Sequence, residues 1–394
     1  MAENGRTICI AGAGISGLTL ALALAQRGAK VVVLERNDAI QEFGAGLQIS
    51  PNARYALNSL GLDAALSAVS FEPEGIDVFA FGHKRPLSTL ELGQAARDRF
   101  NLPYAVMHRA DLVHVLFNAT RQYPEIEVHF DVEGFEVADH QENPAVTYRY
   151  ANGEVHTLNA HAFIGADGVG SKTRTSIVGG KEADYSGYVA WRTLVDIDRL
   201  KDILPSDKTS MLWGPGFHAI AYPLLHRKIF NIALFTKESM SVAFGIHATP
   251  NLPPIIHKDM RFNRILASAG EWTHWPLASV NTRRWYQGAV GLVGDAAHAM
   301  LPFQAQGAAM GIEDALALAP LLVSEDKAET ALLAYENARR VRVSRVVQTS
   351  AKNGRIFHMH GPVATARNIV VQLQGGREHF KRLSWLYDHN PLPS

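Results

Sequence analysis

The feature that most constrains this chain is a glycine-rich turn near its start, where Gly12 to Gly17 fit the pattern G-x-G-x-x-G. A β-prone segment, residues 7–11, precedes the turn, a helix-compatible segment, residues 18–27, follows it, and residues 30–34 form a second strand pattern. The glycines permit a tight turn, close approach of a pyrophosphate and close helix–strand packing. The helix start also offers free amides and a positive dipole end to a phosphate. This segment therefore predicts a Rossmann unit that binds a dinucleotide.

An acidic residue lies where such a unit contacts a ribose: Glu35 follows the second strand, 18 residues past Gly17. A signal peptide is the alternative for this region, because residues 8–25 are an unbroken run of apolar and small residues. The glycines within the run lower its lipophilicity, and the only basic residue before it is Arg6. We therefore favour the dinucleotide site, although the turn alone does not distinguish NAD from FAD.

Composition excludes several other classes of protein. Cys9 is the only cysteine among 394 residues, so the chain has no internal disulfide and no cysteine-rich metal site. We expect no metal and a cytoplasmic location. Lys and Arg together number 38, as do Asp and Glu, and this balance argues against a nucleic-acid partner and against a membrane-bound role. We interpret an arginine cluster, Arg339, Arg340, Arg342 and Arg345, as the solvated face of a long helix.

Two later motifs each place an aspartate at the end of a strand pattern. Residues 162–171 run from a strand into Asp167-Gly168, and residues 289–298 run from a strand into Gly294-Asp295. An aspartate in the second motif can accept hydrogen bonds from a polyol, while the helix expected to begin at residues 306–309 can stabilise an anionic ring edge. These patterns favour FAD as the bound dinucleotide.

The ordered motifs resemble the class A flavoprotein aromatic hydroxylases, which have the p-hydroxybenzoate hydroxylase fold. The resemblance covers nearly the whole chain and includes residues 44–48, residues 108–112 and the closing segment 385–387. Within the family, the chain is most similar to the enzymes that hydroxylate salicylate and 3-hydroxybenzoate. The resemblance implies an α/β fold in which a Rossmann-like FAD-binding domain is interleaved with an antiparallel-sheet substrate domain, followed by C-terminal helices.

The resemblance also implies where the domains lie. The FAD-binding domain is expected to comprise residues 1–72, 100–180 and 280–345, the substrate domain residues 73–99 and 181–279, and a C-terminal helical extension residues 346–394. Because the chain has a single G-x-G-x-x-G motif, FAD is expected to stay bound while NADH or NADPH binds transiently.

Residue roles follow from the same resemblance. Glu35 would hold the adenosine ribose, and Arg109 would contact the flavin side of FAD, with a surface ion pair to Asp111 as its alternative. Asp295 would bond the ribityl chain, while Asp167, with Arg174, would serve both FAD and the nicotinamide nucleotide. The expected cofactor-binding residues are Gly12, Gly14, Ile15, Ser16, Gly17, Glu35, Arg36, Gln48, Arg109, Val132, Asp167, Asp295, Gln306, Gly307 and Ala308.

A segment between the two aspartate motifs is expected to form the substrate pocket. Its strand patterns cover residues 188–195, 210–213, 217–223 and 230–236, which indicates an antiparallel sheet. The two-residue period of a strand places His218, Ile220 and Tyr222 on one face, where an apolar wall and a titratable group can line a pocket. Relatives that hydroxylate 3-hydroxybenzoate have a His and a Tyr at this spacing in the active site. We therefore expect His218 as the base and Tyr222 as its positioning partner, the alternative being two ordinary strand residues.

The expected function is that of a monooxygenase in which NAD(P)H, O₂ and a flavin C4a-hydroperoxide hydroxylate a small phenolic or hydroxy-heteroaromatic acid. A phenolate attacks such an oxidant faster than a phenol, and histidine titrates in the useful range. Pro302 occupies the family's proline position beside the flavin, although 3-hydroxybenzoate hydroxylases can have glutamine there. Either Arg85 or Arg192 could bind a carboxylate. The alternatives are a same-fold monooxygenase acting on a non-phenolic natural product and a non-catalytic FAD-binding protein, and a homodimer stays open.

Overall fold

The first of two large sheets has six strands in the order β17-β18-β11-β1-β2-β7. The structure, a computed structural model, describes residues 6–40, 46–245, 250 and 252–390. All of these strands run parallel except the edge strand β17. Their bounds are β1 Thr7–Ala11, β2 Lys30–Leu34, β7 Ile126–His129, β11 Ala162–Gly165, β17 Tyr286–Gln287 and β18 Val290–Leu292. The strands expected at residues 7–11 and 30–34 therefore have the predicted bounds.

Helices and a small sheet cover the two faces of the six-stranded sheet. Helix α1 (Ile15–Ala25) begins three residues earlier than expected, directly after the glycine turn, and it packs against α5 (Arg109–Thr120) and α9 (Gly307–Ser324). Ile8 and Ile10 of β1 contribute to that core. Cys9 lies on the opposite side, among residues of a three-stranded sheet formed by β8 (Val132–Ala138), β9 (Ala145–Tyr150) and β10 (Val155–Asn159). The single cysteine is thus a packing residue, and burial raises the pKa of its thiol.

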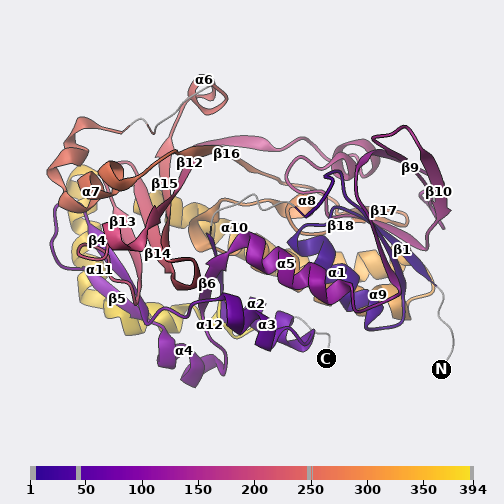
Figure 1. The fold of residues 1–394 in the computed structure, drawn as a ribbon, viewed down its shortest axis with the longest axis horizontal. Helices are drawn as coiled ribbons and strands as arrows, with labels where there is room; N and C mark the ends of the chain where they lie inside the picture. Colours follow the sequence, from indigo (N-terminus) through magenta and orange to yellow (C-terminus); the bar gives the residue numbers. More distant parts are fainter. Residues whose placement is uncertain (1–5, 41–45, 246–249, 251, 391–394) are drawn as a thin grey trace.

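The second large sheet has seven strands in the order β16-β12-β15-β14-β13-β4-β5. Their bounds are β4 Gly75–Ala80, β5 Ser88–Glu91, β12 Asp184–Asp196, β13 Thr209–Trp213, β14 His218–Leu224, β15 Ile229–Lys237 and β16 Thr273–Ser279. All neighbours are antiparallel except β13 and β4. Three of the four expected strand segments fall within one of these strands, and the fourth, residues 217–223, begins one residue before β14. The two sheets therefore draw on alternating segments of the chain, and Figure 1 shows them side by side.

Two long helices connect the sheets at the C-terminal end. Helix α10 (Ala328–Phe357) packs against α9 and β18 near its start, and its last turn reaches the seven-stranded sheet, where Phe357 packs with Trp213. Helix α11 (Gly361–Arg382) then runs along β5 (Figure 1). The boundary expected between residues 345 and 346 falls inside α10, because the buried side of that helix continues through Val346, Ser350 and Gly354.

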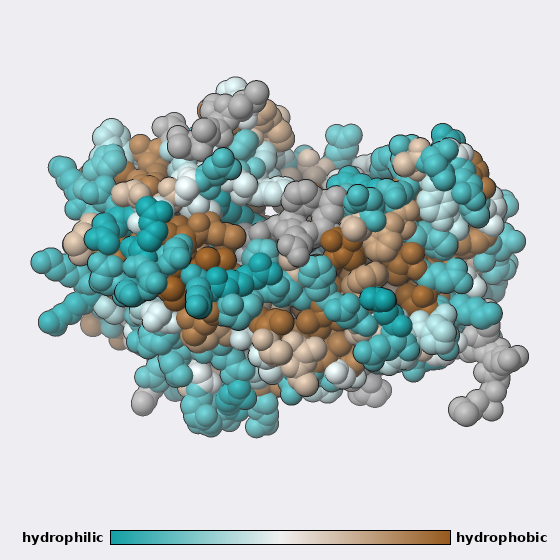
Figure 2. Space-filling view, viewed as in Figure 1, coloured by the Kyte–Doolittle hydropathy of each residue, from teal (hydrophilic) through white to brown (hydrophobic). Residues whose placement is uncertain are grey.

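The remaining β-strands and α-helices are short. They are β3 (Gly46–Ile49) paired with β6 (Ala105–His108), and the helices α2 (Pro51–Ser59), α3 (Asp63–Val69), α4 (Gly93–Phe100), α6 (Met240–Ala243), α7 (Met260–Ser268), α8 (Asp295–His298) and α12 (Ser384–Tyr387). Tyr387 packs edge-on against Phe100, which anchors the terminal segment. Of the described helices, only α9 is long and apolar enough to cross a membrane, and 67% of it is buried within the protein. Figure 2 shows a mostly hydrophilic face with hydrophobic residues gathered in patches near its middle.

Candidate active site

A single cavity of about 1570 Å³ connects the glycine turn with the seven-stranded sheet. Pockets for one small ligand have volumes of about 300–1,000 Å³, so this cavity has room for a larger ligand and a smaller one together. Its lining includes twelve of the expected site residues, namely Gly14, Glu35, Arg36, Gln48, Arg109, Asp167, His218, Tyr222, Asp295, Pro302, Gly307 and Ala308. Residues that are far apart in the sequence are therefore brought to one continuous space.

Six expected residues are not among those that line the cavity: Gly12, Ile15, Ser16, Gly17, Val132 and Gln306. A Cβ atom on Gly17 would lie 1.9 Å from the Gly12 carbonyl oxygen, and one on Gly12 would lie 2.5 Å from the Ala166 carbonyl oxygen. These glycines thus allow the turn, α1 and β11 to pack closely. Residues 44 and 45, part of the resemblance, lie outside the described residues.

An acidic side chain is hydrogen-bonded to the glycine turn. The Glu35 carboxylate accepts a hydrogen bond of 2.9 Å from the Ala13 amide, and its other oxygen accepts bonds from the backbone and side-chain nitrogens of Asn37. Helix α1 begins after Gly14 with no side-chain cap, so the positive end of its dipole faces the cavity uncapped. The turn therefore presents amides to an anionic group and a carboxylate beside it.

The Asp167 loop has a partly different role from the one expected. Asp167 lines the cavity, and its carboxylate accepts hydrogen bonds from the Ser171 hydroxyl and from the amide and hydroxyl of Thr173. Arg174 is buried away from the cavity, and its guanidinium donates to the carbonyls of Val169, Lys181 and Ala296. The structure therefore does not place Arg174 where it could contact a nicotinamide nucleotide, because its donors are used within the protein.

The Gly294-Asp295 turn brings Asp295 close to the start of α9. Gly294 has φ +60° and ψ −139°, and a Cβ atom there would lie 2.3 Å from the Ser16 hydroxyl oxygen, so this position requires glycine. A Cβ atom on Gly307 would lie 3.9 Å from a carboxylate oxygen of Asp295. Helix α9 begins at Gly307 with no side-chain cap, so its first amides face the same part of the cavity as Asp295.

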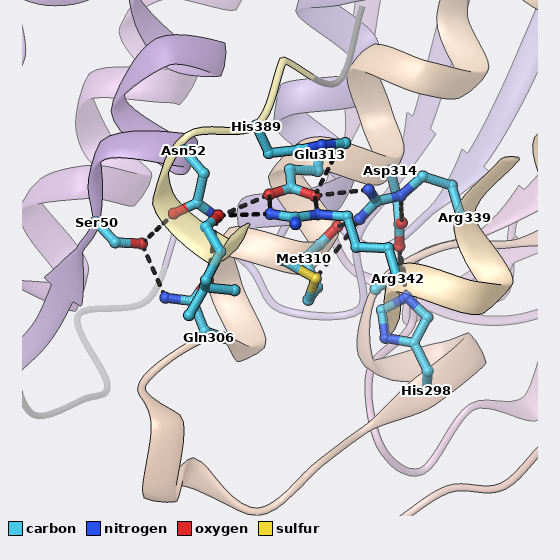
Figure 3. Close-up of polar contacts among 12 residues, drawn as sticks. Ser50, Asn52, His298, Gln306, Met310, Glu313, Asp314, Arg339, Arg342 and His389 are labelled. Atoms are coloured by element: carbon cyan, nitrogen blue, oxygen red, sulfur yellow. Dashed lines mark hydrogen bonds and ion pairs between the residues drawn. The ribbon is translucent and has the colours of Figure 1, made fainter. Parts of the chain in front are cut away.

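A buried ionic cluster holds these two turns in place (Figure 3). Glu313 of α9 pairs with Arg339 at 2.6 Å and with Arg342 at 2.7 Å, and Asp314 pairs with Arg339 at 2.8 Å. Arg339 is 2% exposed, so the expectation of a solvated face is wrong for Arg339 and for the largely buried Arg342. The acidic partners lie on a different helix, which a local pattern cannot reveal.

The same cluster is hydrogen-bonded to both turns. Asp314 accepts hydrogen bonds from the Gly294 amide and from His298, at 3.0 and 2.6 Å. Asn52 links Glu313 to Gln306, the residue before α9. Burial raises the pKa of Asp314, but the charges of His298 and Arg339 outweigh it and hold that pKa well below its ordinary value. The carboxylates therefore stay charged and fix both turns.

The seven-stranded sheet presents the expected face to the cavity. His218, Ile220 and Tyr222 all line it, as the strand period predicts. The His218 ring is 3% exposed and stacks on Phe235, with ring centroids 4.6 Å apart. Burial, with a smaller effect of His358, lowers the pKa of His218 well below its ordinary value, so the imidazole is neutral. Burial also raises the pKa of Tyr222, which keeps its hydroxyl protonated.

The structure separates the two arginines considered for a carboxylate. Arg192 of β12 lines the cavity, whereas Arg85 is exposed outside it. The Nε atom of Arg192 is buried and has no hydrogen-bond partner among the described residues. Arg109 also lines the cavity, and its alternative partner Asp111 pairs instead with His226 at 2.8 Å and with Arg227. Both guanidinium groups are thus available to an anionic ligand.

Sequence reasoning missed the aromatic and helical wall opposite this face. Phe303, Phe357 and His358 surround the His218 ring, and the last two lie at the end of α10. Residues of α11, including Arg367 and Val371, continue the wall. No sequence signal indicates these contacts, because His358 is 140 residues from His218.

Comparison with known proteins gives consistent matches over the chain. The model of the family described as "FAD binding domain" matches residues 6–350. A 3-hydroxybenzoate 6-hydroxylase of Aquipseudomonas alcaligenes is 32% identical over 386 residues, covering 96% of this chain and 97% of the relative. The structure of Klebsiella pneumoniae HpxO with FAD and uric acid has a TM-score of 0.82 at 21% identity, over 97% and 96% of the two chains. A salicylate hydroxylase substrate complex has a TM-score of 0.76 at 23% identity, over 99% and 97%. The expected fold class is confirmed.

Proposed function

The chain belongs to the FAD binding domain family, and from that premise we propose that it is a flavoprotein monooxygenase. It uses NADH or NADPH and O₂ to hydroxylate a small phenolic or hydroxy-heteroaromatic acid. The observation that carries this proposal is the single cavity that runs from the glycine turn to His218 and Tyr222. The name of the 32% identical relative, a 3-hydroxybenzoate 6-hydroxylase, supports the choice of substrate class.

The residues present fit FAD. The uncapped start of α1 suits the pyrophosphate, Glu35 the adenosine ribose, and Asp295 the ribityl chain. The uncapped start of α9 at Gly307 suits the anionic edge of the flavin ring, and the unpartnered Nε of Arg192 is a further donor in the same cavity. When bound and reduced by the nicotinamide nucleotide, FAD supplies the oxygen atom taken from O₂.

The chain's own contribution is to bind the aromatic ring and remove its phenolic proton. His218 is neutral and lines the cavity, so a ring nitrogen can accept that proton from the substrate hydroxyl. Tyr222 keeps its proton and lies two residues along the same strand face, where its hydroxyl can orient a polar substituent. Loss of the proton raises the electron density of the ring and favours electrophilic oxygen transfer.

The aromatic wall keeps water from the proton acceptor. Phe235, Phe303 and Phe357 contact the His218 ring on three sides, with centroid distances of 4.6, 5.2 and 5.1 Å. Pro302 lines the cavity next to Phe303 and can limit the space beside the flavin ring. Exclusion of water strengthens each polar interaction inside the site.

An anionic substrate group has a cation available in this cavity. Arg192 lines the cavity. Burial lowers the pKa of its guanidinium, and the positive charge of nearby Arg109 lowers it further. A carboxylate there would relieve the cost of this partly buried cation, whose buried Nε has no hydrogen-bond partner within the described part of the chain. Arg192, and not Arg85, is therefore the arginine that binds a carboxylate or the cofactor.

The direct test is a substrate panel with the FAD-loaded protein. We expect salicylate, 3-hydroxybenzoate or 6-hydroxynicotinate to stimulate NADH or NADPH oxidation and to yield a hydroxylated product. The variant His360→Gln should behave like the wild type in this panel, because His360 is exposed and does not line the cavity. A protein that cannot be loaded with FAD, or whose NAD(P)H oxidation no phenolic acid stimulates, would refute the proposal.

The apolar character of the wall supports a second candidate of the same fold, a monooxygenase acting on a non-phenolic natural product. Ile220, Trp213 and Val371 line the substrate end, and Arg367 there donates to the carbonyls of Ile356 and Phe357. If no member of the phenolic panel incorporates oxygen while the flavin is still reduced, the result favours this candidate. A homodimer and a cytoplasmic location complete the proposal, and light scattering and cell fractionation test them.

A further inference from the structure

A second histidine contacts the proposed base from behind. His358 follows the last residue of α10, and its Nε2 atom lies 2.6 Å from Nδ1 of His218 on β14. The two rings have centroids 4.8 Å apart, and His358 is 6% exposed. A separation of 2.6 Å between two ring nitrogens requires one shared proton between them. The two side chains therefore form a buried pair.

The position of that proton decides what His218 can do. A neutral imidazole has one N–H donor and one nitrogen acceptor. If His218 donates from Nδ1, its Nε2 is free to accept a proton from the cavity. If His358 donates instead, Nε2 of His218 must itself carry a proton and cannot serve as a base. His358 thus determines the tautomer of His218.

The other nitrogen of His358 supports an active role. Its Nδ1 atom is buried and has no hydrogen-bond partner among the residues that the structure describes. A buried polar atom without a partner costs about 1–3 kcal/mol, and a phenylalanine would fill the space without that cost. Packing alone therefore does not account for a histidine at this position.

We propose that His358 is a positioning residue that holds His218 with Nδ1 protonated and Nε2 free, and that takes up the Nδ1 proton during the reaction. The inference rests on the proposed function. The phenolic O–H bond breaks as its proton bonds to Nε2 of His218, and the Nδ1 proton then moves to Nε2 of His358. His218 returns to neutral, and the positive charge lies one ring farther from the phenolate.

Few charged groups face the pair. Tyr188 of β12 packs on the His358 ring at 5.0 Å, and Lys237 of β15 lies over the Tyr188 ring. Arg367 of α11 donates to the Phe357 carbonyl next to His358. Burial, and secondly Lys237, lowers the pKa of His358 to about 4, so His358 is neutral in the resting enzyme near neutral pH. A neutral His358 can accept the hydrogen bond that the proposed tautomer needs.

The test reads the tautomer directly in the FAD-loaded enzyme. Proteins labelled with ¹⁵N-histidine are compared as wild type, His358→Gln, His358→Phe and the exposed control His360→Gln, with His218→Gln to assign the signals. We expect His218 in the wild type and in the control to show a protonated Nδ1 and an unprotonated Nε2. Glutamine can still accept the hydrogen bond and should preserve this state, whereas phenylalanine should abolish it.

Turnover gives a second, separate measurement. We expect kcat of His358→Gln and His358→Phe to fall about 10-fold, a part of the roughly 10²-fold or larger contribution of a general base, with KM little changed. In His358→Phe the limb of the pH–kcat profile that reports the base should move to lower pH, because protonated His218 loses the hydrogen-bond acceptor that stabilises it.

The outcomes separate this inference from the proposed function. A wild-type His218 with a protonated Nε2, or a tautomer unchanged in His358→Phe, overturns the inference even when hydroxylation proceeds. Loss of turnover without a shift of the pH profile also overturns it, because a structural role would explain that result. Absence of turnover with every substrate would count against the proposed function, while the NMR result would still decide the role of His358.

Discussion

Substitution of Arg339 by methionine tests whether the ionic cluster supports the cofactor site. Arg339 donates from Nε to Asp314 and from Nη1 to Glu313, at 2.8 and 2.6 Å. All three side chains are at most 2% exposed. Methionine fills much of the same volume but leaves both buried carboxylates without this cation.

The structure allows the magnitude to be worked out. Removal of one partner from a buried ion pair costs about 3–5 kcal/mol. The lower end applies, because Asp314 keeps its bonds to His298 and Gly294, and Glu313 keeps its bonds to Arg342 and Asn52. An unfolding entropy of about 2.1 cal/mol/K per residue corresponds to about 0.8 kcal/mol/K for 394 residues. A decrease of about 3 kcal/mol in the free energy of unfolding therefore lowers Tm by about 4 °C in a single transition.

The assay is thermal and urea unfolding of the FAD-loaded variants, with flavin release followed by fluorescence. Arg355→Met is the matched control, because Arg355 is an exposed arginine of the same helix, and a change below about 1 kcal/mol is expected there. Arg339→Met should also weaken FAD binding, since the cluster holds the Gly294 amide. Equal stability losses in the two variants would refute the role assigned to the cluster.

The cluster also predicts an acid dependence of stability. The pKa values of Glu313 and Asp314 are lowered in the folded state, although burial opposes the shift. The two carboxylates therefore stabilise the fold at a pH above their unfolded pKa values, which are about 4. This stabilisation is lost as the pH falls below those values. The difference in the free energy of unfolding between wild type and Arg339→Met should therefore shrink below about pH 4. A constant difference from about pH 7 to about pH 3 would contradict this explanation.

Three further variants test the cavity. Glu35→Ala should raise the Kd for FAD about 10-fold or more, because a charged acceptor of the turn is lost, and an unchanged Kd in a flavin fluorescence titration would count against its role. Gly294→Ala should yield protein with little bound flavin, since a Cβ atom would lie 2.3 Å from the Ser16 hydroxyl oxygen, whereas normal flavin absorbance would exclude that clash. His218→Ala should retain FAD, but its turnover of phenolic substrates should fall about 100-fold. If the variant turns over as fast as the wild type from about pH 6 to about pH 9, His218 is not the base.

The parts of the fold that the sequence predicts well are those with a local pattern. Residues 7–11 and 30–34 are short apolar runs beside a glycine turn, and they form β1 and β2 with the predicted bounds. The start of α1 differs by three residues, because Gly14 precedes the helix without a capping side chain that would mark it. His218 and Tyr222 share a face because the period of a strand is two residues, and both line the cavity.

The parts of the fold and of the site that the sequence does not predict depend on partners that are distant in sequence. Arg339 resembles a solvated residue when only its own helix is considered, because its acidic partners lie 25 and 26 residues earlier on α9. Arg174 follows an Asp-Gly motif typical of ligand contact, yet it donates to three backbone carbonyls. His358 reaches His218 only because α10 runs from one sheet to the other, and no local pattern specifies that path.

The central claim is that this cavity couples a bound flavin to oxygen insertion into an aromatic ring. The most direct measurement is mass spectrometry of the product formed from a hydroxybenzoate by the FAD-loaded enzyme with NADH or NADPH under ¹⁸O₂. We predict one ¹⁸O atom in a new ring hydroxyl for each productive turnover, and the loss of that product in His218→Ala. NAD(P)H oxidation that produces only hydrogen peroxide with every phenolic acid, or a hydroxyl whose oxygen comes from water, would contradict the account.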